Sequence, residues 1–317
     1  MARENLRSQL RAGVERVKIR GDLRRRLERA GGTTGSRRRN DGYSGARLDR
    51  GPPMPRLFDL PIHVSSRWIF NCYVVELDGG AALVVDPGLP VTATGALEAL
   101  RELEAESVTV VSSHGHSDHV GGIPTLLGAV RGKVWLPARC EAYLAGELPR
   151  APGLREVAKI LPVFGDQRFD WQAVREFAGE ASKQGYGRSP RMQISFEVEG
   201  FLRDGDTIEN APGWEVLHTP GHTDDSTCLY HRASATLISG DAVLTHAGRA
   251  WFNPEVTDRG ASNDTETRLR ELDVRHLLPG HGKPIAGKAL LRDARSFRDQ
   301  PETRSTLSRI ARRVGSW

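Results

Sequence analysis

The sequence predicts a layered α/β fold with a metal site at the ends of its strands. From residue 68 onward, strand-like apolar runs alternate with helix-like segments, which is typical of sheets covered by helices. Four of the apolar runs lead into short loops whose side chains are competent to bind metal ions. The richest of these loops is Ser112–Gly122 (SSHGHSDHVGG). No helix or strand requires that composition, so the loop is the best guide to function.

The 317-residue chain is long enough for one large domain or two small ones. Its net charge of +5 is unevenly distributed: residues 1–50 hold 15 Lys and Arg against 6 Asp and Glu, a net +9, which leaves −4 for the remainder. We therefore expect a basic N-terminal extension, residues 1–53, and a mildly acidic main domain, residues 54–317. The charge of the main domain does not favour nucleic-acid binding.

The extension has two parts. Apolar residues from Leu6 to Leu27 recur at nearly helical spacing among arginines, and residues 30–53 have the composition of a linker. A solvated tail is the favoured interpretation, and an arm that contacts nucleic acid is the alternative.

Cysteine content and hydropathy indicate the compartment. Three cysteines (Cys72, Cys140 and Cys228) fit buried thiols in a reducing environment better than a disulfide framework. No apolar run approaches the roughly 20 residues of a membrane span. No apolar segment of a secretory signal follows the N-terminal arginines. We expect a cytoplasmic protein with no membrane partner.

The first elements form a regular series. Strands at Ile69–Leu77 and Ala81–Asp86 flank the turn signal Asp78-Gly79-Gly80. A helix over Thr92–Ala105 follows, because Leu97, Leu100 and Leu103 have helical spacing. The next expected elements are a strand at Val108–Ser112, a helix at Gly122–Ala129 and a strand at Lys133–Leu136.

Residues 137–192 interrupt this series with helical pieces and a polar loop, and we expect an insertion that covers the active site and selects the substrate. The expected strands beyond it are Gln193–Val198, Trp214–His218, Ser226–His231, Ala235–Ile238 and the apolar run His276–Leu278. The expected helices are Thr265–Leu272, Ile285–Phe297 and Pro301–Val314.

The candidate metal ligands come from four loops. In an extended segment His114 and His116 point the same way and can bind one ion together. Asp118 and His119 follow directly and can face a second ion. The three later loops, which contain TPGH, SGD and PGHG, supply His222, Asp241 and His281. Imidazole and carboxylate suit zinc, iron and manganese. The predicted groups are His114, His116 and His222 for one ion, and Asp118, His119 and His281 for another, with Asp241 between them.

These motifs, in this order, resemble the metallo-β-lactamase superfamily of hydrolases. The run Val84–Gly88 (VVDPG) also matches that family's early strand and turn. The resemblance spans roughly residues 58–291 and fills all seven ligand positions. It implies an αββα four-layer sandwich with a dinuclear metal site at one edge.

The ligands imply a hydrolytic mechanism. Two ions that share a water would lower its pKa and give hydroxide near neutral pH. Asp118 is expected to bind metal and to orient the nucleophile or carry its proton. Asp86 is expected to hydrogen-bond a ligand or its loop, because ligated histidines need an outer partner. Asp224 and Asp225 are expected to tie the loop, and His246 is a candidate substrate contact.

The resemblance favours a thioester, ester or lactone substrate, as in glyoxalase II-like thioesterases and lactonases. The cofactors are expected to be two divalent ions, with zinc first and iron or manganese as alternatives. A ribonuclease or phosphodiesterase, a mono-iron sulfur dioxygenase and a metal-stabilised nucleic-acid-binding protein are the other functions considered. The sequence leaves the oligomeric state open.

Overall fold

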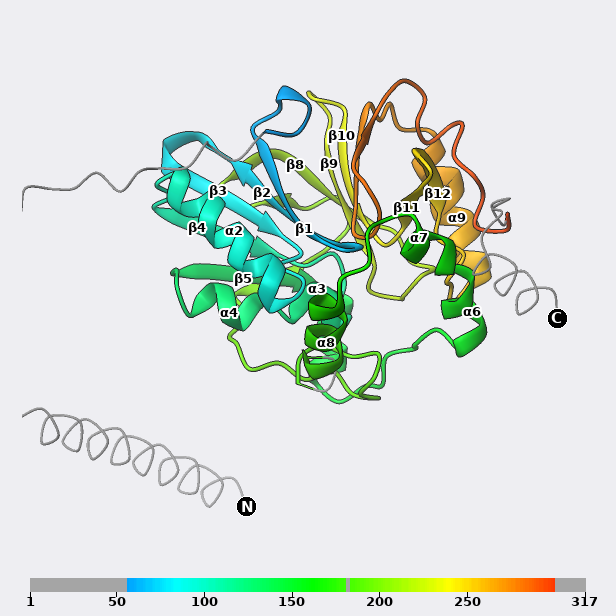
Figure 1. Cartoon of the computed structure of the whole chain (residues 1–317), viewed down its shortest axis with the longest axis horizontal. Coiled ribbons are helices and arrows are strands. Elements are labelled where there is room, and N and C mark those ends of the chain that lie inside the picture. Colours follow the sequence, from blue (N-terminus) through cyan, green and yellow to red (C-terminus); the bar gives the residue numbers. More distant parts are fainter. Residues whose placement is uncertain (1–55, 181–182, 300–317) are drawn as a thin grey trace, which may run out of the picture. The chain divides into compact units, whose positions relative to one another are not determined.

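The computed structural model describes residues 56–180 and 183–299 (Figure 1). The chain divides into the units Met1–Gly51 and Pro52–Trp317, and all described residues belong to the second. The predicted extension 1–53 and the predicted helix Pro301–Val314 lie outside the described residues.

Two six-stranded sheets form the centre of this unit. The first sheet runs in chain order: β1 (Ile62–Arg67), β2 (Phe70–Glu76), β3 (Ala81–Val85), β4 (Ser107–Val111), β5 (Gly132–Pro137) and β6 (Gly200–Leu202). The second has the order β14 (Ile285–Ala286), β13 (His276–Pro279), β10 (Thr236–Gly240), β9 (Thr227–His231), β8 (Ala211–His218) and β7 (Thr207–Ile208). A separate hairpin joins β11 (Val243–His246) to β12 (Arg249–Phe252).

Helices cover the outer faces of the sheets. The helices are α2 (Pro90–Glu102), α3 (Ser117–Val120), α4 (Ile123–Leu127), α5 (Arg139–Leu144), α6 (Leu154–Lys159), α7 (Leu161–Gly165), α8 (Trp171–Glu180) and α9 (Arg259–Arg270), with single 3₁₀ turns at Leu57–Asp59 and Asp78–Gly80. Figure 1 shows α2 and α4 against the first sheet and α9 beyond the second. Among the described residues, no helix is long and apolar enough to cross a bilayer.

The alternation of side chains along the strands explains the layers. In β3, Leu83 and Val85 belong to the core between the two sheets, whereas Val84 packs toward the helices. In β10, Ile238 faces the same central core, whereas the neighbouring Leu237 packs on the side of α9. Strands that are buried on both faces need a cover on each side, so the αββα prediction is confirmed.

Three of the ligand loops meet at one edge because of strand direction. Strand β10 pairs in parallel with β13, and β8 runs antiparallel to β9, which runs antiparallel to β10. The carboxyl ends of β8, β10 and β13 therefore lie at the same edge of the second sheet. The histidine loop reaches this edge from β4 of the first sheet, where the Thr227 N–H donates a 2.8 Å hydrogen bond to the Ser113 carbonyl.

Two predicted elements are wrong. The segment Gln193–Val198 forms only one isolated bridge, Gly185 to Gln193, and the neighbouring strand is β6 instead. Its apolar residues still pack on the core of the first sheet. The predicted helix Ile285–Phe297 is a short strand followed by turns.

Candidate metal centre

The histidine loop follows β4 and changes conformation halfway. His116 is extended, with φ −62° and ψ 148°, and α3 begins at the next residue. His114 and His116 therefore precede the helix, whereas Asp118 and His119 lie on the first turn of α3. Because the backbone changes from extended to helical, the pair His114 and His116 and the pair Asp118 and His119 face different parts of the ligand cluster.

Two of the other ligand loops approach their neighbours closely through glycines. Gly221, before His222, has φ +141°, and a Cβ there would lie 2.3 Å from Ser262 Oγ. Gly280, before His281, has its Cβ position 2.4 Å from Asp241 Oδ1. Only glycine allows the backbone to come this near.

The structure brings all seven candidate ligands together. Their donor atoms form three groups, each within 4.8 Å: His114, His116 and His222; His114, His119 and Asp241; and Asp118, His119 and His281. The first and third groups have the membership of the two sets predicted from the sequence.

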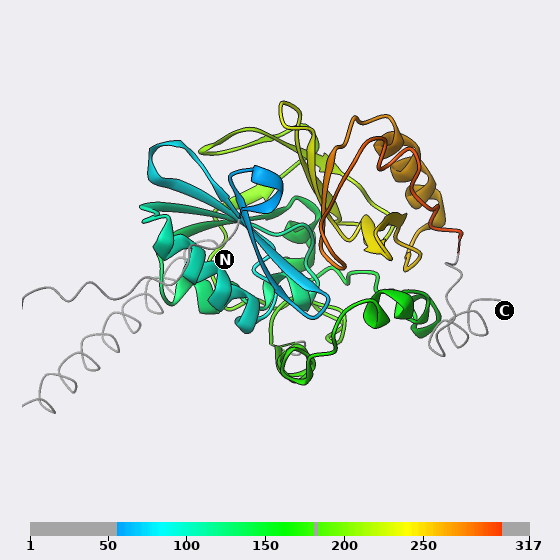
Figure 2. The same cartoon turned by 45° about the horizontal axis from the view of Figure 1, so that its top comes forward.

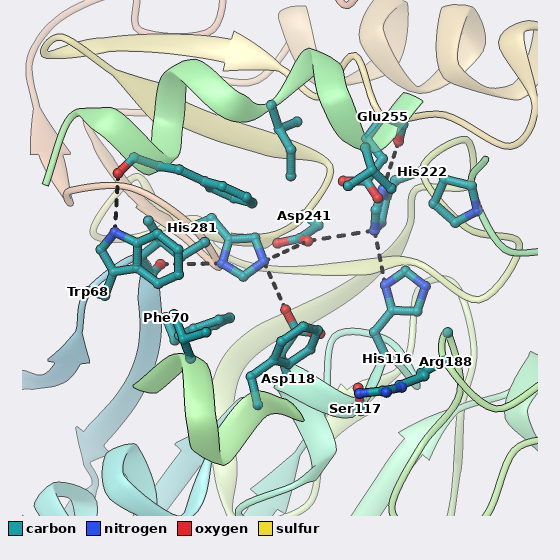
Figure 3. A pocket seen from close by; sticks show the side chains of 18 of the residues that line it. Trp68, Phe70, His116, Ser117, Asp118, Arg188, His222, Asp241, Glu255 and His281 are labelled. Atoms are coloured by element: carbon teal, nitrogen blue, oxygen red, sulfur yellow. Dashed lines mark hydrogen bonds and ion pairs between the residues drawn. The ribbon is translucent and has the colours of Figure 1, made fainter. Parts of the chain in front are cut away.

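Asp241 lies between these sets (Figure 3). Its Oδ2 is 3.2 Å from His281 Nε2 and 3.6 Å from His222 Nε2. Its Oδ1 is 3.5 Å from His119 Nε2. Asp118 Oδ2 is also 3.2 Å from His281 Nε2. One carboxylate thus faces donors of both sets, as a bridging ligand must.

Backbone carbonyls contact the outward ring nitrogens of two candidate ligands. The Glu255 carbonyl lies 2.7 Å from His222 Nδ1, and the Ile69 carbonyl lies 3.3 Å from His281 Nδ1. Such contacts orient each ring so that its other nitrogen faces the cluster.

Asp86 and Ser113 orient the histidines of the first loop. Asp86 Oδ2 lies 3.0 Å from His119 Nδ1, and Ser113 Oγ lies 3.1 Å from His114 Nδ1. Asp86 also accepts hydrogen bonds from the Ser113 backbone N–H at 2.7 Å and from the Ser113 hydroxyl at 2.8 Å. Asp86 therefore has the location expected of an outer partner.

Asp225 holds the other side of the histidine loop. It is fully buried, accepts a 2.7 Å hydrogen bond from the Gly115 N–H, and also accepts one from the Tyr186 hydroxyl. Asp225 thus ties the loop, whereas the neighbouring Asp224 pairs with Arg150.

Burial and neighbouring charges shift the pKa values of the residues in the cluster, some upward and some downward. Burial, with the nearby His222, lowers the pKa of His116 to about 4. Burial alone would raise the pKa of Asp118, but the hydrogen bond from His281 and the surrounding imidazoles bring it well below its usual range. Burial would lower the pKa of His281, yet Asp241 and Asp118 raise it to about 10. Burial would also raise the pKa of Asp241, but His281 and His119 bring it well below its usual range, so both aspartates are held as carboxylates.

The donor set fits divalent metal ions. His116 Nε2, His119 Nε2 and Asp241 Oδ1 are buried and have no hydrogen-bond partner among the described residues. Burial of polar atoms without hydrogen-bond partners is energetically unfavourable, so these atoms are expected to bind an ion. Imidazole nitrogens and carboxylate oxygens are the donors that zinc, iron and manganese accept.

A pocket of about 450 Å³ opens from the cluster. One end is formed by candidate ligands, namely His116, Asp118, His222, Asp241 and His281. The rest of its wall is mostly apolar and comes from the turn between β1 and β2 and from the predicted insertion 137–192. Figure 2 shows the helices of this insertion, in green, at the edge of the sheets.

The structure does not place His246 in this pocket wall. His246 lies on β11, is buried, and has its Nδ1 3.3 Å from Arg295 Nη1. The residue predicted as a substrate contact is therefore not among the residues that line the cavity that the ligands face.

Sequence reasoning missed Trp68, Phe70 and Glu255, which do line the pocket. Burial raises the pKa of Glu255 to about 7, although His222 opposes the shift. These residues lie outside the ligand motifs, so no local pattern marked them.

Comparisons with known proteins agree with this geometry. The family model described as "Metallo-beta-lactamase superfamily" matches residues 67–281. "Probable metallo-hydrolase YflN" of Bacillus subtilis is 24% identical over 281 residues, which cover 80% of this chain and 91% of that protein. Hydroxyacylglutathione hydrolase GloC of Haemophilus influenzae is 24% identical over 217 residues, covering 67% of this chain and 85% of that protein.

Among solved structures, an archaeal metallo-beta-lactamase superfamily protein from Sulfolobus tokodaii has a TM-score of 0.49 and 15% identity, with 80% of this chain and 94% of that chain covered. The family match spans the strands β2 to β5, the histidine loop and the loops that carry the other three candidate ligands. This chain belongs to the metallo-β-lactamase superfamily.

Proposed function

We propose that this protein is a metallo-hydrolase that cleaves a thioester, an ester or a lactone at a centre for two metal ions. The observation that carries the proposal is the set of three overlapping donor groups joined by Asp241 at the end of a pocket. A single structural zinc site would need four ligands and no opening, whereas this site has seven candidate ligands and faces a cavity.

The two ions would have separate ligands on either side of Asp241. His114, His116 and His222 would hold one ion, and Asp118, His119 and His281 the other. Zinc is the proposed metal, with iron and manganese as alternatives, because all three accept this donor set. Bound ions of this kind supply an activated water and polarise the oxygen of the scissile bond.

The chain's own residues orient the reactants. Asp118 faces the pocket and is fixed by the 3.2 Å contact from its Oδ2 to His281. As an ionised carboxylate it can direct the attacking water and accept its proton. Asp86 and Asp225 hold the histidine loop from two sides, and this support limits movement of the ligands during the reaction.

Acyl transfer is favoured over other chemistries by one of the relatives. GloC, to which this chain is 24% identical, is named as a hydroxyacylglutathione hydrolase, and a hydroxyacylglutathione is a thioester. A thioester or the related lactone is therefore the first substrate class to test.

The test combines metal analysis with an activity screen on one purified sample. We expect about two ions per chain and turnover of a thioester, an ester or a lactone. The variant Asp118→Asn should lower kcat by at least about 100-fold, because the carboxylate that orients the nucleophile is lost.

Asp224→Asn is the matched control for this substitution. Asp224 pairs with Arg150 near the site and is not among the candidate ligands, so the variant should retain most of its activity. An equal loss in both variants would show that the effect of Asp118→Asn is not specific to the proposed centre.

The same screen separates the alternatives. Turnover of a phosphodiester or short RNA would move the protein to the nuclease class, and oxygen consumption with a persulfide and one iron per chain would indicate a dioxygenase. Nucleic-acid binding without turnover would favour the non-enzymatic alternative. Absence of stoichiometric metal would contradict the proposed centre.

A further inference from the structure

The part of the pocket beyond the candidate ligands is lined by aromatic and aliphatic side chains. Phe164, Phe169 and Phe177 reach it from the α7–α8 region, and Trp68 and Phe70 reach it from the turn between β1 and β2. The ring centroid of Trp68 lies 5.2 Å from that of Phe164 and 4.9 Å from that of Phe169. These side chains form one continuous apolar wall.

This wall extends up to the candidate metal ligands. The Phe70 ring centroid lies 5.8 Å from that of Phe177 and 5.4 Å from that of His281, so apolar surface begins beside the ligand cluster (Figure 3). Trp68 Nε1 donates a hydrogen bond of 3.1 Å to the Phe164 carbonyl, which leaves the indole without a free polar group. Trp68 therefore offers no hydrogen-bond donor to a substrate group in this part of the pocket.

The backbone at the turn positions Trp68 in this wall. Trp68 has φ +53°, a left-handed conformation that the first residue of a two-residue hairpin turn can adopt, and Arg67 and Phe70 on either side of the turn are paired. The conformation accompanies the packing of the indole against Phe164 and Phe169.

Charge is scarce in the same wall. Apart from the candidate ligands, Arg188 and Glu255 are the residues with ionisable side chains among the described residues that line the pocket. Arg188 is exposed. An anionic group such as a peptide carboxylate or a polyphosphate could therefore pair with only one cationic side chain of this wall, Arg188. An alkyl or aryl group could contact most of the lining residues.

We propose that this apolar wall binds the acyl chain of the substrate, so that the enzyme prefers long apolar acyl groups over short or polar ones. The inference rests on the proposed hydrolytic function and adds its substrate class. Each methylene that enters the wall would strengthen binding about three- to fourfold until the pocket is full.

The experiment uses the metal-loaded, full-length protein and a series of thioesters with one leaving group and acyl chains from acetyl to decanoyl. We expect kcat/KM to rise with chain length and to exceed that for S-lactoylglutathione. Val157 lies on α6 and lines the pocket. Val157→Trp should therefore fill part of the pocket and lower kcat/KM for the decanoyl thioester at least about tenfold, with less than about a threefold change for acetyl.

Leu154→Trp is the matched control. Leu154 lies about one helical turn earlier on α6, is 89% exposed and does not line the pocket, so its profile should match that of the unmodified protein. Equal rates for all chain lengths, or a preference for S-lactoylglutathione, would overturn the inference while leaving the hydrolase intact.

A binding measurement separates failure of the inference from failure of the proposed function. Calorimetric titration with butanoate and decanoate needs no turnover. Tighter binding of decanoate that Val157→Trp removes would support the apolar site even if no ester is cleaved. Equal binding of the two carboxylates would contradict it.

Discussion

His246 illustrates how one residue can report on the pH dependence of stability. Burial lowers the pKa of His246, Arg295 lowers it further, and Asp166 opposes both. Because the folded-state pKa lies below the unfolded value, the unfolded chain binds the proton more readily. This histidine therefore lowers the free energy of unfolding as pH falls through the ordinary histidine range.

His246→Gln should reduce that loss. Between about pH 7 and pH 5, the range in which an ordinary histidine titrates, the free energy of unfolding should decrease less in the variant than in the unmodified protein. Urea denaturation at each pH measures the difference. His218→Gln is a suitable control, because His218 is exposed. An identical decrease in the unmodified protein and in His246→Gln would contradict the assignment.

The seven candidate ligands could be predicted because each lies in a short motif with a distinct composition. His114 and His116 are two residues apart, and His222, Asp241 and His281 each directly follow a glycine. The walls of the pocket could not be predicted in this way. The apolar residues that form them are ordinary in the sequence, and only the tertiary fold places them beside His281.

At the scale of elements, the ligand loops depend on glycine at a crowded point. An added Cβ at Gly280 would lie 2.4 Å from Asp241 Oδ1 and 2.8 Å from His119 Cε1. Both are candidate ligand side chains, and neither can keep its place if that volume is filled.

Gly280→Ala should therefore lower activity about 100-fold, because a displacement of about 1 Å in a reactive site has an effect of that size. Metal content and kcat/KM would be measured together. Gly179→Ala on α8 is the control, since nothing lies within 4 Å of its Cβ position. Retention of full activity by Gly280→Ala would show that the loop tolerates the shift.

The mispredicted helix has a physical explanation. Residues 285–297 contain apolar side chains at helical spacing, but their carbonyls find another partner. Arg270 of α9 donates to the carbonyls of Leu291, Arg292 and Ala294 at 2.9, 2.7 and 3.0 Å. Arg270, which is distant in sequence, thus satisfies backbone carbonyls that a helix would satisfy internally. The spacing of the apolar residues does not reveal this interaction.

The hairpin β11–β12 is also absent from the prediction. Its turn residues Ala247 and Gly248 both have positive φ, at 51° and 72°. That geometry suits a two-residue hairpin, but Ala-Gly is a weaker signal than Asn-Gly or Asp-Gly. By contrast, the regular series from β2 to β5 is predictable, because each element has its own period and length.

At the scale of the whole molecule, metal should stabilise the fold. The candidate ligands come from loops of both sheets, so an ion would join the two halves of the sandwich. An ion at about 100 times its dissociation constant would add about 2.7 kcal/mol to the free energy of unfolding.

Chelation should reverse this gain. Urea denaturation with zinc and then with excess chelator would measure the difference, and His116→Ala should show a smaller one. Equal stability with and without metal would contradict the proposed bridging of the sheets.

The three cysteines lie in two separate cores: Cys72 and Cys140 share the core between the first sheet and its helices, and Cys228 lies in the core on the side of α9. Cys72 lies in β2, Cys228 in β9 and Cys140 in α5, and all three are fully buried. Burial raises the pKa of each thiol, in the case of Cys228 to about 12. Each thiol is thus shielded from alkylating reagents until its own core opens. Modification of Cys228 before or after the pair Cys72 and Cys140 during denaturation would record which of the two cores opens first.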